Sequence, residues 1–285
     1  MGVARTILAL RAKVDGWRAD GLKIGFAPTM GALHEGHLSL VRLGTSLCDR
    51  VVASIFINPK QFAAHEDIAT YPRAEARDLE LLAAAGCRLV YAPDASEMYP
   101  PGFQTSIAVE TLSKGLDGVS RPHFFGGVAT VVLKLLNQCR PDVAIFGEKD
   151  FQQLLLVRRM VRDLDLDIEI VGAPIVREAD GLAMSSRNAY LSPAERQIAG
   201  RLNAIIADVA RRIATQEPVA AAIEHGRRAL AAAGFPSIDY LEARAEADLE
   251  LLGPGPAGDA PARVFVAVML GRTRLIDNWK IERKT

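Results

Sequence analysis

The sequence lacks a net charge of either sign, because 34 Lys and Arg residues balance 34 Asp and Glu residues over its 285 positions. It has no long basic run, which argues against non-specific nucleic-acid binding as its main activity. It also lacks an apolar stretch of transmembrane length, and its N-terminus has no signal-peptide core followed by a small-residue cleavage site. We therefore expect a cytoplasmic protein without nucleic-acid or membrane partners.

Cysteine is scarce as well. Cys48, Cys87 and Cys139 are odd in number, far apart, and form no Cys-x-x-Cys pair. Disulfide frameworks and zinc sites use paired cysteines, so small buried thiols in a reducing compartment explain these three best. No other group of metal ligands and no Ser–His–acid set stands out by spacing. The sequence leaves the protein ligands of any metal unknown.

Short apolar runs alternate with helical patterns over the first two thirds of the chain. The apolar runs predict strands over residues 24–27, 51–57, 88–91, 142–146 and 167–171. Between them, segments such as 74–85 and 128–136 have the apolar spacing of helices. Strands that alternate with helices predict an α/β fold, here a Rossmann-like parallel sheet with helices on both faces.

The composition changes after about residue 180. Ser192 and Pro193 are typical of a helix N-cap and first position, and two alanine-rich helices are expected over about 194–214 and 218–233. Three strand candidates follow, at 238–243, 263–269 and 273–276. This pattern predicts a smaller C-terminal α+β domain. We place the boundary between a domain of residues 1–176 and one of residues 177–285.

The stretch from residue 22 to residue 40 is the most informative. Its strand is ended by Pro28, Gly31 allows a sharp turn, and a helical pattern begins at His37. Backbone N–H groups at such a helix start bind anions. The stretch is neither a Gly-x-Gly-x-x-Gly turn nor a P-loop. It is not His-Glu-x-x-His either, because His34 and His37 are three residues apart and are expected to precede the helix body. A turn with two solvated histidines is the alternative; two imidazoles at one turn favour a phosphate site.

Polar segments also follow other predicted strands. Lys149, next to Glu148, is placed to meet phosphate oxygens as a compact charge. Ser185, Ser186 and Arg187 offer two hydroxyls and a guanidinium fork, which suits a triphosphate. Gln61 and Gln153 are neutral amides that suit a small hydroxylated acid. Taken singly, each could instead be a solvated loop residue, a helix cap or a surface amide. Many donors without an obvious nucleophile indicate phosphate-transfer chemistry that relies on positioning and charge stabilisation.

These motifs carry a resemblance to a known family. Residues 28–38, Pro-Thr-Met-Gly-Ala-Leu-His-Glu-Gly-His-Leu, resemble the His-x-Gly-His signature of the nucleotidyltransferase superfamily, in the form it takes in the pantothenate synthetase (pantoate–β-alanine ligase) family. The resemblance continues through residues 57–62, 71–73, 146–154 and 176–188. It covers most of residues 5–191 and then thins to residues 273–278.

The resemblance implies an enzyme that condenses pantoate with β-alanine, using ATP and Mg²⁺ and releasing AMP and pyrophosphate through pantoyl adenylate. It implies a homodimer whose C-terminal domain closes on the ATP site. Implied catalytic residues are His37, His34, Lys149, Ser185, Ser186 and Arg187. Implied ATP-binding residues are Met30, Gly31, Ala32, Leu33, His34, Glu35, Gly36, His37, Gly147, Glu148, Lys149, Asp150, Val176, Met184, Ser185, Ser186 and Arg187. Gln61 and Gln153 are implied to hold pantoate, with Gln61 also near β-alanine.

The chain departs from the family pattern at one place. Where the pattern has Arg-Pro-x-His-Phe-x-Gly-Val, residues 121–128 place Phe124 at the histidine position and His123 one residue earlier. This puts the local contact of that histidine in doubt. Two other interpretations stay open: a different adenylyl- or cytidylyltransferase with the same first signature, and a catalytically silent nucleotide-binding regulator.

Overall fold

The computed structural model describes residues 1–62 and 74–282. It divides into two compact units: residues 1–148 with 152–174, and residues 149–151 with 175–285. The short segment Lys149–Phe151 packs with the C-terminal unit although it lies between two stretches of the first. The sequence-based division at residues 176 and 177 remains a prediction.

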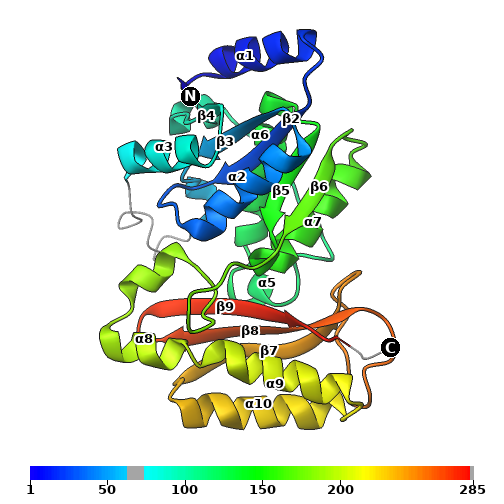
Figure 1. Cartoon of the computed structure of the whole chain (residues 1–285). Coiled ribbons are helices and arrows are strands. Elements are labelled where there is room, and N and C mark those ends of the chain that lie inside the picture. Colours follow the sequence, from blue (N-terminus) through cyan, green and yellow to red (C-terminus); the bar gives the residue numbers. More distant parts are fainter. Residues whose placement is uncertain (63–73, 283–285) are drawn as a thin grey trace. The chain divides into compact units, whose positions relative to one another are not determined.

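The first unit is a parallel sheet in the strand order β1-β4-β3-β2-β5-β6 (Figure 1). Its strands are β1 (Gly2–Ala4), β2 (Ile24–Thr29), β3 (Arg50–Ile55), β4 (Leu89–Tyr91), β5 (Val143–Gly147) and β6 (Glu169–Ala173). Its helices are α1 (Ile7–Ala19), α2 (Glu35–Leu47), η1 (Pro59–Gln61), α3 (Glu75–Ala84), α4 (Ala95–Met98), α5 (Asp117–Ser120), α6 (Phe124–Cys139) and α7 (Phe151–Asp163) from Gln152 onward. The chain passes to the second unit within η2 (Glu148–Asp150).

Both faces of this sheet are covered. Consecutive strand residues point to opposite faces, yet Phe26 and Ala27 are both buried. On one face, Ala27 and Ala53 share an apolar core with Val41 of α2. This confirms the parallel α/β fold predicted from the alternating apolar runs. The three-residue edge strand β1 was not predicted, because so short a run has no readable period.

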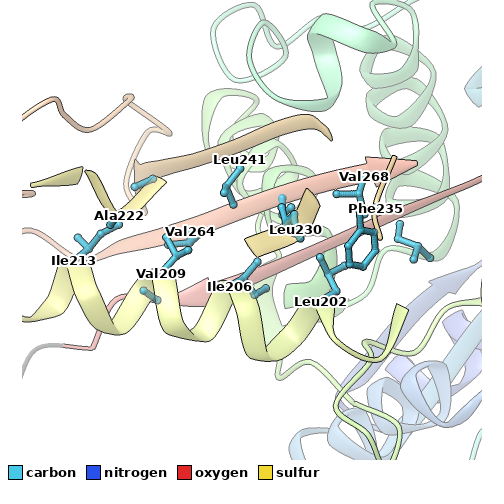
Figure 2. Close-up of a cluster of buried hydrophobic side chains, with 14 of the residues drawn as sticks. Leu202, Ile206, Val209, Ile213, Ala222, Leu230, Phe235, Leu241, Val264 and Val268 are labelled. Atoms are coloured by element: carbon cyan, nitrogen blue, oxygen red, sulfur yellow. The ribbon is translucent and has the colours of Figure 1, made fainter. Parts of the chain in front are cut away.

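The second unit is an antiparallel sheet covered by helices. Its elements are η3 (Ser186–Tyr190), α8 (Pro193–Ala199), α9 (Leu202–Ala214), α10 (Val219–Ala233), β7 (Ser237–Ala245), β8 (Ala262–Leu270) and β9 (Thr273–Lys280). Figure 2 shows the core that α9 and α10 form with the sheet, with Leu202, Ile206, Val209, Ile213, Ala222, Leu230, Phe235, Leu241, Val264 and Val268 labelled. The predicted C-terminal α+β region is therefore present.

One predicted helix is two. The single helix expected over about 194–214 is interrupted between α8 and α9, where Gly200 lies so close to Asp180 that an added Cβ would sit 2.3 Å from Asp180 Oδ2. Ser192 caps α8, as expected, by accepting a hydrogen bond from the Glu195 backbone N–H. In the described part of the chain, no helix has the length and apolar character needed to cross a membrane.

Candidate active site

The turn between β2 and α2 is built around backbone N–H groups. Gly31 has a φ of 83° and Ala32 a φ of 52°, so the chain turns sharply through the left-handed region. The carboxylate of Asp78, on α3, accepts hydrogen bonds from the backbone N–H groups of Ala32 and Leu33, each over 2.9 Å. Asp78 is 2% exposed. A buried carboxylate that two N–H groups satisfy thus fixes the turn.

The two histidines lie at the start of α2 but not entirely before it. His34 is the N-cap residue, and His37 is the third helical residue. This corrects the expectation that both precede the helix body. His34 is the N-cap, so α2 begins at Glu35, and His37 takes the place of the usual Glu or Gln of a capping box. The two rings are in contact, with their centroids 4.0 Å apart and their planes tilted by 36°.

The capping contact determines which nitrogen of a neutral His37 ring carries the proton. His37 Nδ1 accepts the backbone N–H of His34 over 3.4 Å. A neutral imidazole that accepts at Nδ1 carries its proton on Nε2, so His37 can donate through Nε2. Glu35, in the same turn, pairs with Arg42 two helical turns later. The helix start therefore combines oriented N–H groups with an imidazole donor, a combination suited to phosphate oxygens.

A second polar group lies at the end of the neighbouring strand β3. Asn58 is fully buried and Gln61 is 9% exposed. Asn58 Nδ2 donates to Gln61 Oε1 over 3.0 Å and to the Gly127 carbonyl over 3.1 Å. Gly127 lets α6 approach this closely, because an added Cβ would lie 2.1 Å from the Lys60 carbonyl oxygen. The amide of Gln61 is held with its Nε2 as the group left to bind a ligand.

The first unit thus places three predicted segments after adjacent strands. The turn of Met30–His37 follows β2, Asn58–Gln61 follows β3, and Gly147 ends β5. The strand order puts β2 between β3 and β5. Because parallel strands end at the same edge, these segments lie along the edge where open α/β sheets bind ligands.

Two adjacent glutamines on α7 differ in their burial. Gln153, the predicted one, is partly exposed. Gln152 is buried, and its Nε2 donates to the carbonyls of Leu112 and Gly115, each over 2.8 Å. Its Oε1 accepts the Asp117 backbone N–H over 3.2 Å. Gln152 therefore holds the irregular segment before α5, a role that its sequence position did not reveal.

Lys149 belongs to the second unit. Its side chain is 20% exposed, and its Nζ lies 3.8 Å from Asp150 Oδ1. Its backbone carbonyl accepts a hydrogen bond from Asn278 Nδ2 over 3.0 Å. Asn278 lies on β9, so the last strand of the chain contacts the backbone of a residue that precedes it by 129 positions.

Residues 184–187 lie in the same unit, after a short hairpin. Met184 N–H donates to the Val176 carbonyl over 3.0 Å, and Arg177 bridges to Ala183. Ser185 Oγ accepts the Arg187 N–H over 3.3 Å and so caps η3. Ser185, Ser186 and Arg187 are all partly exposed. The helix-cap interpretation is confirmed for Ser185.

The variant segment near residue 124 has a definite local structure. Phe124 is the first residue of α6 and lies under the Arg121 guanidinium, whose carbon is 3.9 Å from the ring centroid. Arg121 donates to the Gln61 carbonyl over 3.1 Å. His123 is exposed at the N-cap position and makes no side-chain cap hydrogen bond. Residues 71–73, part of the family resemblance, lie outside the described residues.

The fold and the histidine-bearing helix start define an α/β protein of the nucleotide-binding class. Similarity to known proteins narrows that class. The family model described as pantoate-beta-alanine ligase matches residues 2–280. The pantothenate synthetase of Caulobacter vibrioides is 54% identical over 98% of each chain, and that of Rhodospirillum rubrum 56% identical over 97% of each. The chain belongs to this family: it is an enzyme with pantoate–β-alanine ligase activity, which forms pantothenate.

Solved structures of related proteins match the fold of this chain over nearly its whole length. The crystal structure of pantothenate synthetase from Thermus thermophilus matches with a TM-score of 0.91 and 44% identity, covering 99% of each chain. The pantoate-beta-alanine ligase of Francisella tularensis, complexed with beta-gamma ATP and beta-alanine, matches with a TM-score of 0.83 and 32% identity, covering 100% of this chain and 99% of that one.

Proposed function

We propose that the chain joins pantoate to β-alanine in two steps, with ATP as the activating substrate. A pantoate carboxylate oxygen attacks the α-phosphorus of ATP, the bond to the β-phosphate breaks, and pyrophosphate leaves. The amine of β-alanine then attacks the acyl carbon of pantoyl adenylate, loses a proton, and expels AMP. Direct amine attack on a free carboxylate would have to expel oxide, a very poor leaving group, whereas AMP leaves readily.

The single observation that carries this proposal is the helix start of α2. Asp78 fixes the turn that leads into this helix, and the Nε2 donor of His37 in the first helical turn is preorganised for a charged phosphate. We propose that Met30–His37, Gly147–Asp150, Val176 and Met184–Arg187 bind ATP. Within this set, His37, His34 and Lys149 stabilise charge on the phosphates, and Ser185, Ser186 and Arg187 hold the triphosphate.

Gln61 and Gln153 are proposed to bind pantoate, with Gln61 also near β-alanine. The buried Asn58 contact supports this role for Gln61, because it holds the amide in one orientation. The complex of the Francisella tularensis relative with beta-gamma ATP and beta-alanine supports the choice of substrates.

Mg²⁺ is proposed to enter with ATP. Phosphate oxygens and waters supply most ligands of Mg²⁺ in nucleotide sites, together with one or two carboxylates. Such binding needs no protein cage. Over residues 1–62 and 74–282 no group of three or more His, Cys, Asp or Glu side chains is arranged to hold a metal. The ion would neutralise phosphate charge as pyrophosphate leaves.

A homodimer and a cytoplasmic location also belong to the proposal. The cysteines support a reducing compartment, since Cys48, Cys87 and Cys139 are free thiols. Burial raises the pKa of Cys87 to about 11 and raises that of Cys139 further. Thiols of this kind are inert packing groups.

The order of the two steps can be tested with one substrate withheld. Enzyme mixed with ATP, Mg²⁺ and pantoate should release about one equivalent of pyrophosphate per active site and then stop, because the closed site shields the adenylate from water. Adding β-alanine should release AMP and start steady turnover. Formation of ADP and phosphate would instead show an acyl-phosphate route. Pyrophosphate release that strictly requires β-alanine would argue against a separate first step.

A further inference from the structure

Strand β9 carries two buried polar residues side by side in a mostly apolar unit. Asp277 is 3% exposed and Asn278 is 2% exposed. Consecutive strand residues point to opposite faces of a sheet. Asp277 pairs in register with Val266, a core residue on the α9 and α10 side, while Asn278 pairs with Phe265, which packs on Phe151. The two side chains therefore reach different segments from one point of the strand.

Asp277 anchors the segment that leads to Ser185–Arg187. Its carboxylate accepts two hydrogen bonds from the Arg177 guanidinium, over 2.7 and 3.0 Å. Arg177 also donates to the Gly181 carbonyl over 3.0 Å, and so holds the turn of the hairpin. Burial raises the pKa of the Asp277 carboxyl, and the hydrogen bonds and charge of Arg177 oppose that rise. This bidentate pair fixes the hairpin on the strand.

Asn278 anchors the segment of Lys149. Its Nδ2 donates to the Lys149 carbonyl, and its Oδ1 accepts from the buried Arg263 over 2.7 Å. Arg263 also pairs with Glu246 over 2.8 Å and lies over the Phe151 ring. Because Arg263 can only donate, it orients the Asn278 amide with Nδ2 toward Lys149. Arg263 thus sets the direction of the contact that holds the lysine backbone.

We propose that Asp277 and Asn278 are positioning residues that set the spacing between Lys149 and the Ser185–Arg187 segment, and that this spacing serves adenylate formation. The inference rests on the proposed function, in which both segments meet the phosphates of ATP. Burying a polar side chain costs desolvation free energy, even when it is hydrogen-bonded. Asp277 and Asn278 are adjacent and hold two different segments, and the reaction would require those two segments at a fixed separation. Both residues are proposed to act through the segments they hold, without touching a substrate.

The two half-reactions separate a positioning role from a general structural one. Asn278→Ala and Asp277→Asn should slow pyrophosphate formation from ATP and pantoate by about 10-fold to 100-fold, the scale expected for a misplacement of about 1 Å. Release of AMP from supplied pantoyl adenylate with β-alanine should change less than about twofold, because the triphosphate is no longer present. Thr273→Val is the matched control, since Thr273 is a buried residue of β9 whose hydroxyl makes no hydrogen bond within the described part of the chain.

The outcomes are distinguishable. If Asn278→Ala does not fold, Asn278→Asp keeps the shape and the partner of Arg263 but turns a carboxylate oxygen toward the Lys149 carbonyl. Normal pyrophosphate formation in a folded Asn278 variant would overturn the inference. So would an equal loss in both half-reactions, or the same loss in Thr273→Val. Wild-type protein that forms no pyrophosphate from ATP and pantoate would instead overturn the proposed two-step route.

Discussion

The Tyr99 hydroxyl donates to Asn58 Oδ1 over 2.8 Å. Asn58 Oδ1 also accepts the Lys60 backbone N–H over 3.3 Å, so the oxygen of this amide is fixed on one side and its Nδ2 on the other. That Nδ2 in turn donates to Gln61 Oε1 and so fixes the Gln61 amide. Tyr99 thus orients Gln61, a residue proposed to bind pantoate, through Asn58. Burial raises the pKa of Tyr99 to about 12, so its hydroxyl keeps its proton at neutral pH.

Replacing Tyr99 with phenylalanine should therefore weaken acid binding. Loss of one neutral hydrogen bond costs about 1 kcal/mol, or about 5-fold in affinity. We expect the KM for pantoate to rise by about that factor, while the KM for ATP stays nearly constant. Tyr91→Phe is the matched control, because among the described residues the buried Tyr91 hydroxyl hydrogen-bonds only to the Met98 sulfur. Equal changes in both KM values, or in both variants, would contradict the relay through Asn58.

The second prediction concerns Asp78. In Asp78→Asn one acceptor oxygen becomes an NH₂ group that faces a backbone N–H, so the turn loses a hydrogen bond and gains a repulsion. Leaving a buried donor unsatisfied costs about 1–3 kcal/mol. Thermal unfolding should show a loss of this size, and the KM for ATP should rise with little change in that for β-alanine. Glu80→Gln, on the same helix, is the control. Wild-type kinetics in Asp78→Asn would mean that the turn keeps its shape unaided.

The sequence predicted the sheet, the turn and most helices because apolar periodicity is local. It did not predict Asp78 as the support of the turn, since a carboxylate inside a helical run looks like any solvated helix residue. It could not separate Gln152 from Gln153 either, because burial of one neighbour and exposure of the other depend on the segment before α5. The break before α9 depends on Asp180, which is close in space only after the hairpin has formed.

The third prediction concerns His37 itself. His37→Ala should lower turnover by about 10²–10³, the usual cost of losing one preorganised donor to a developing anion, with a smaller change in ATP affinity. Alanine also removes the cap acceptor, so His37→Gln is the companion variant, since glutamine at this position can still cap the helix. We expect His37→Gln to retain the melting temperature and to remain catalytically impaired. Near-normal turnover in folded His37→Ala would remove this residue from the catalytic set.

The fourth prediction concerns pH. The hydrogen bond from Arg196 lowers the pKa of Asp180 below its usual value of 3.8. A lowered carboxyl pKa adds stability that is present above the unfolded pKa and is lost as pH falls through the folded pKa. Asp180→Asn should therefore be less stable than wild type at pH 6, by less than about 1 kcal/mol because the side chain is 43% exposed, and equal to it near pH 2.

Melting temperatures measured from about pH 2 to about pH 6, the range that spans the titration of aspartate, would check this, with Asp163→Asn as the control. Asp163 is an exposed aspartate whose nearest arginine nitrogens lie 3.7 Å away. A difference between Asp180→Asn and wild type that persists unchanged at the acid end of this range would show that shape, rather than charge, holds the hairpin.

The last prediction concerns the variant segment at residues 123 and 124. Phe124 lies under Arg121, which in turn donates to the carbonyl of Gln61, so the aromatic ring supports a residue that contacts the proposed pantoate site. His123 is exposed at the start of α6, one residue before the position of the family histidine. If His123 takes over the contact of the family histidine, His123→Ala should impair activity by about 10-fold or more, because losing one hydrogen bond to a charged group costs about 1.5–3 kcal/mol. Phe124→His should then be tolerated or improve turnover.

Steady-state kinetics with pantoate and ATP varied separately would measure the effects of both substitutions. The partly exposed His225, replaced by alanine on α10, serves as the control. A silent His123→Ala would mean that the segment works without that histidine contact, with the Arg121–Phe124 stack as its support.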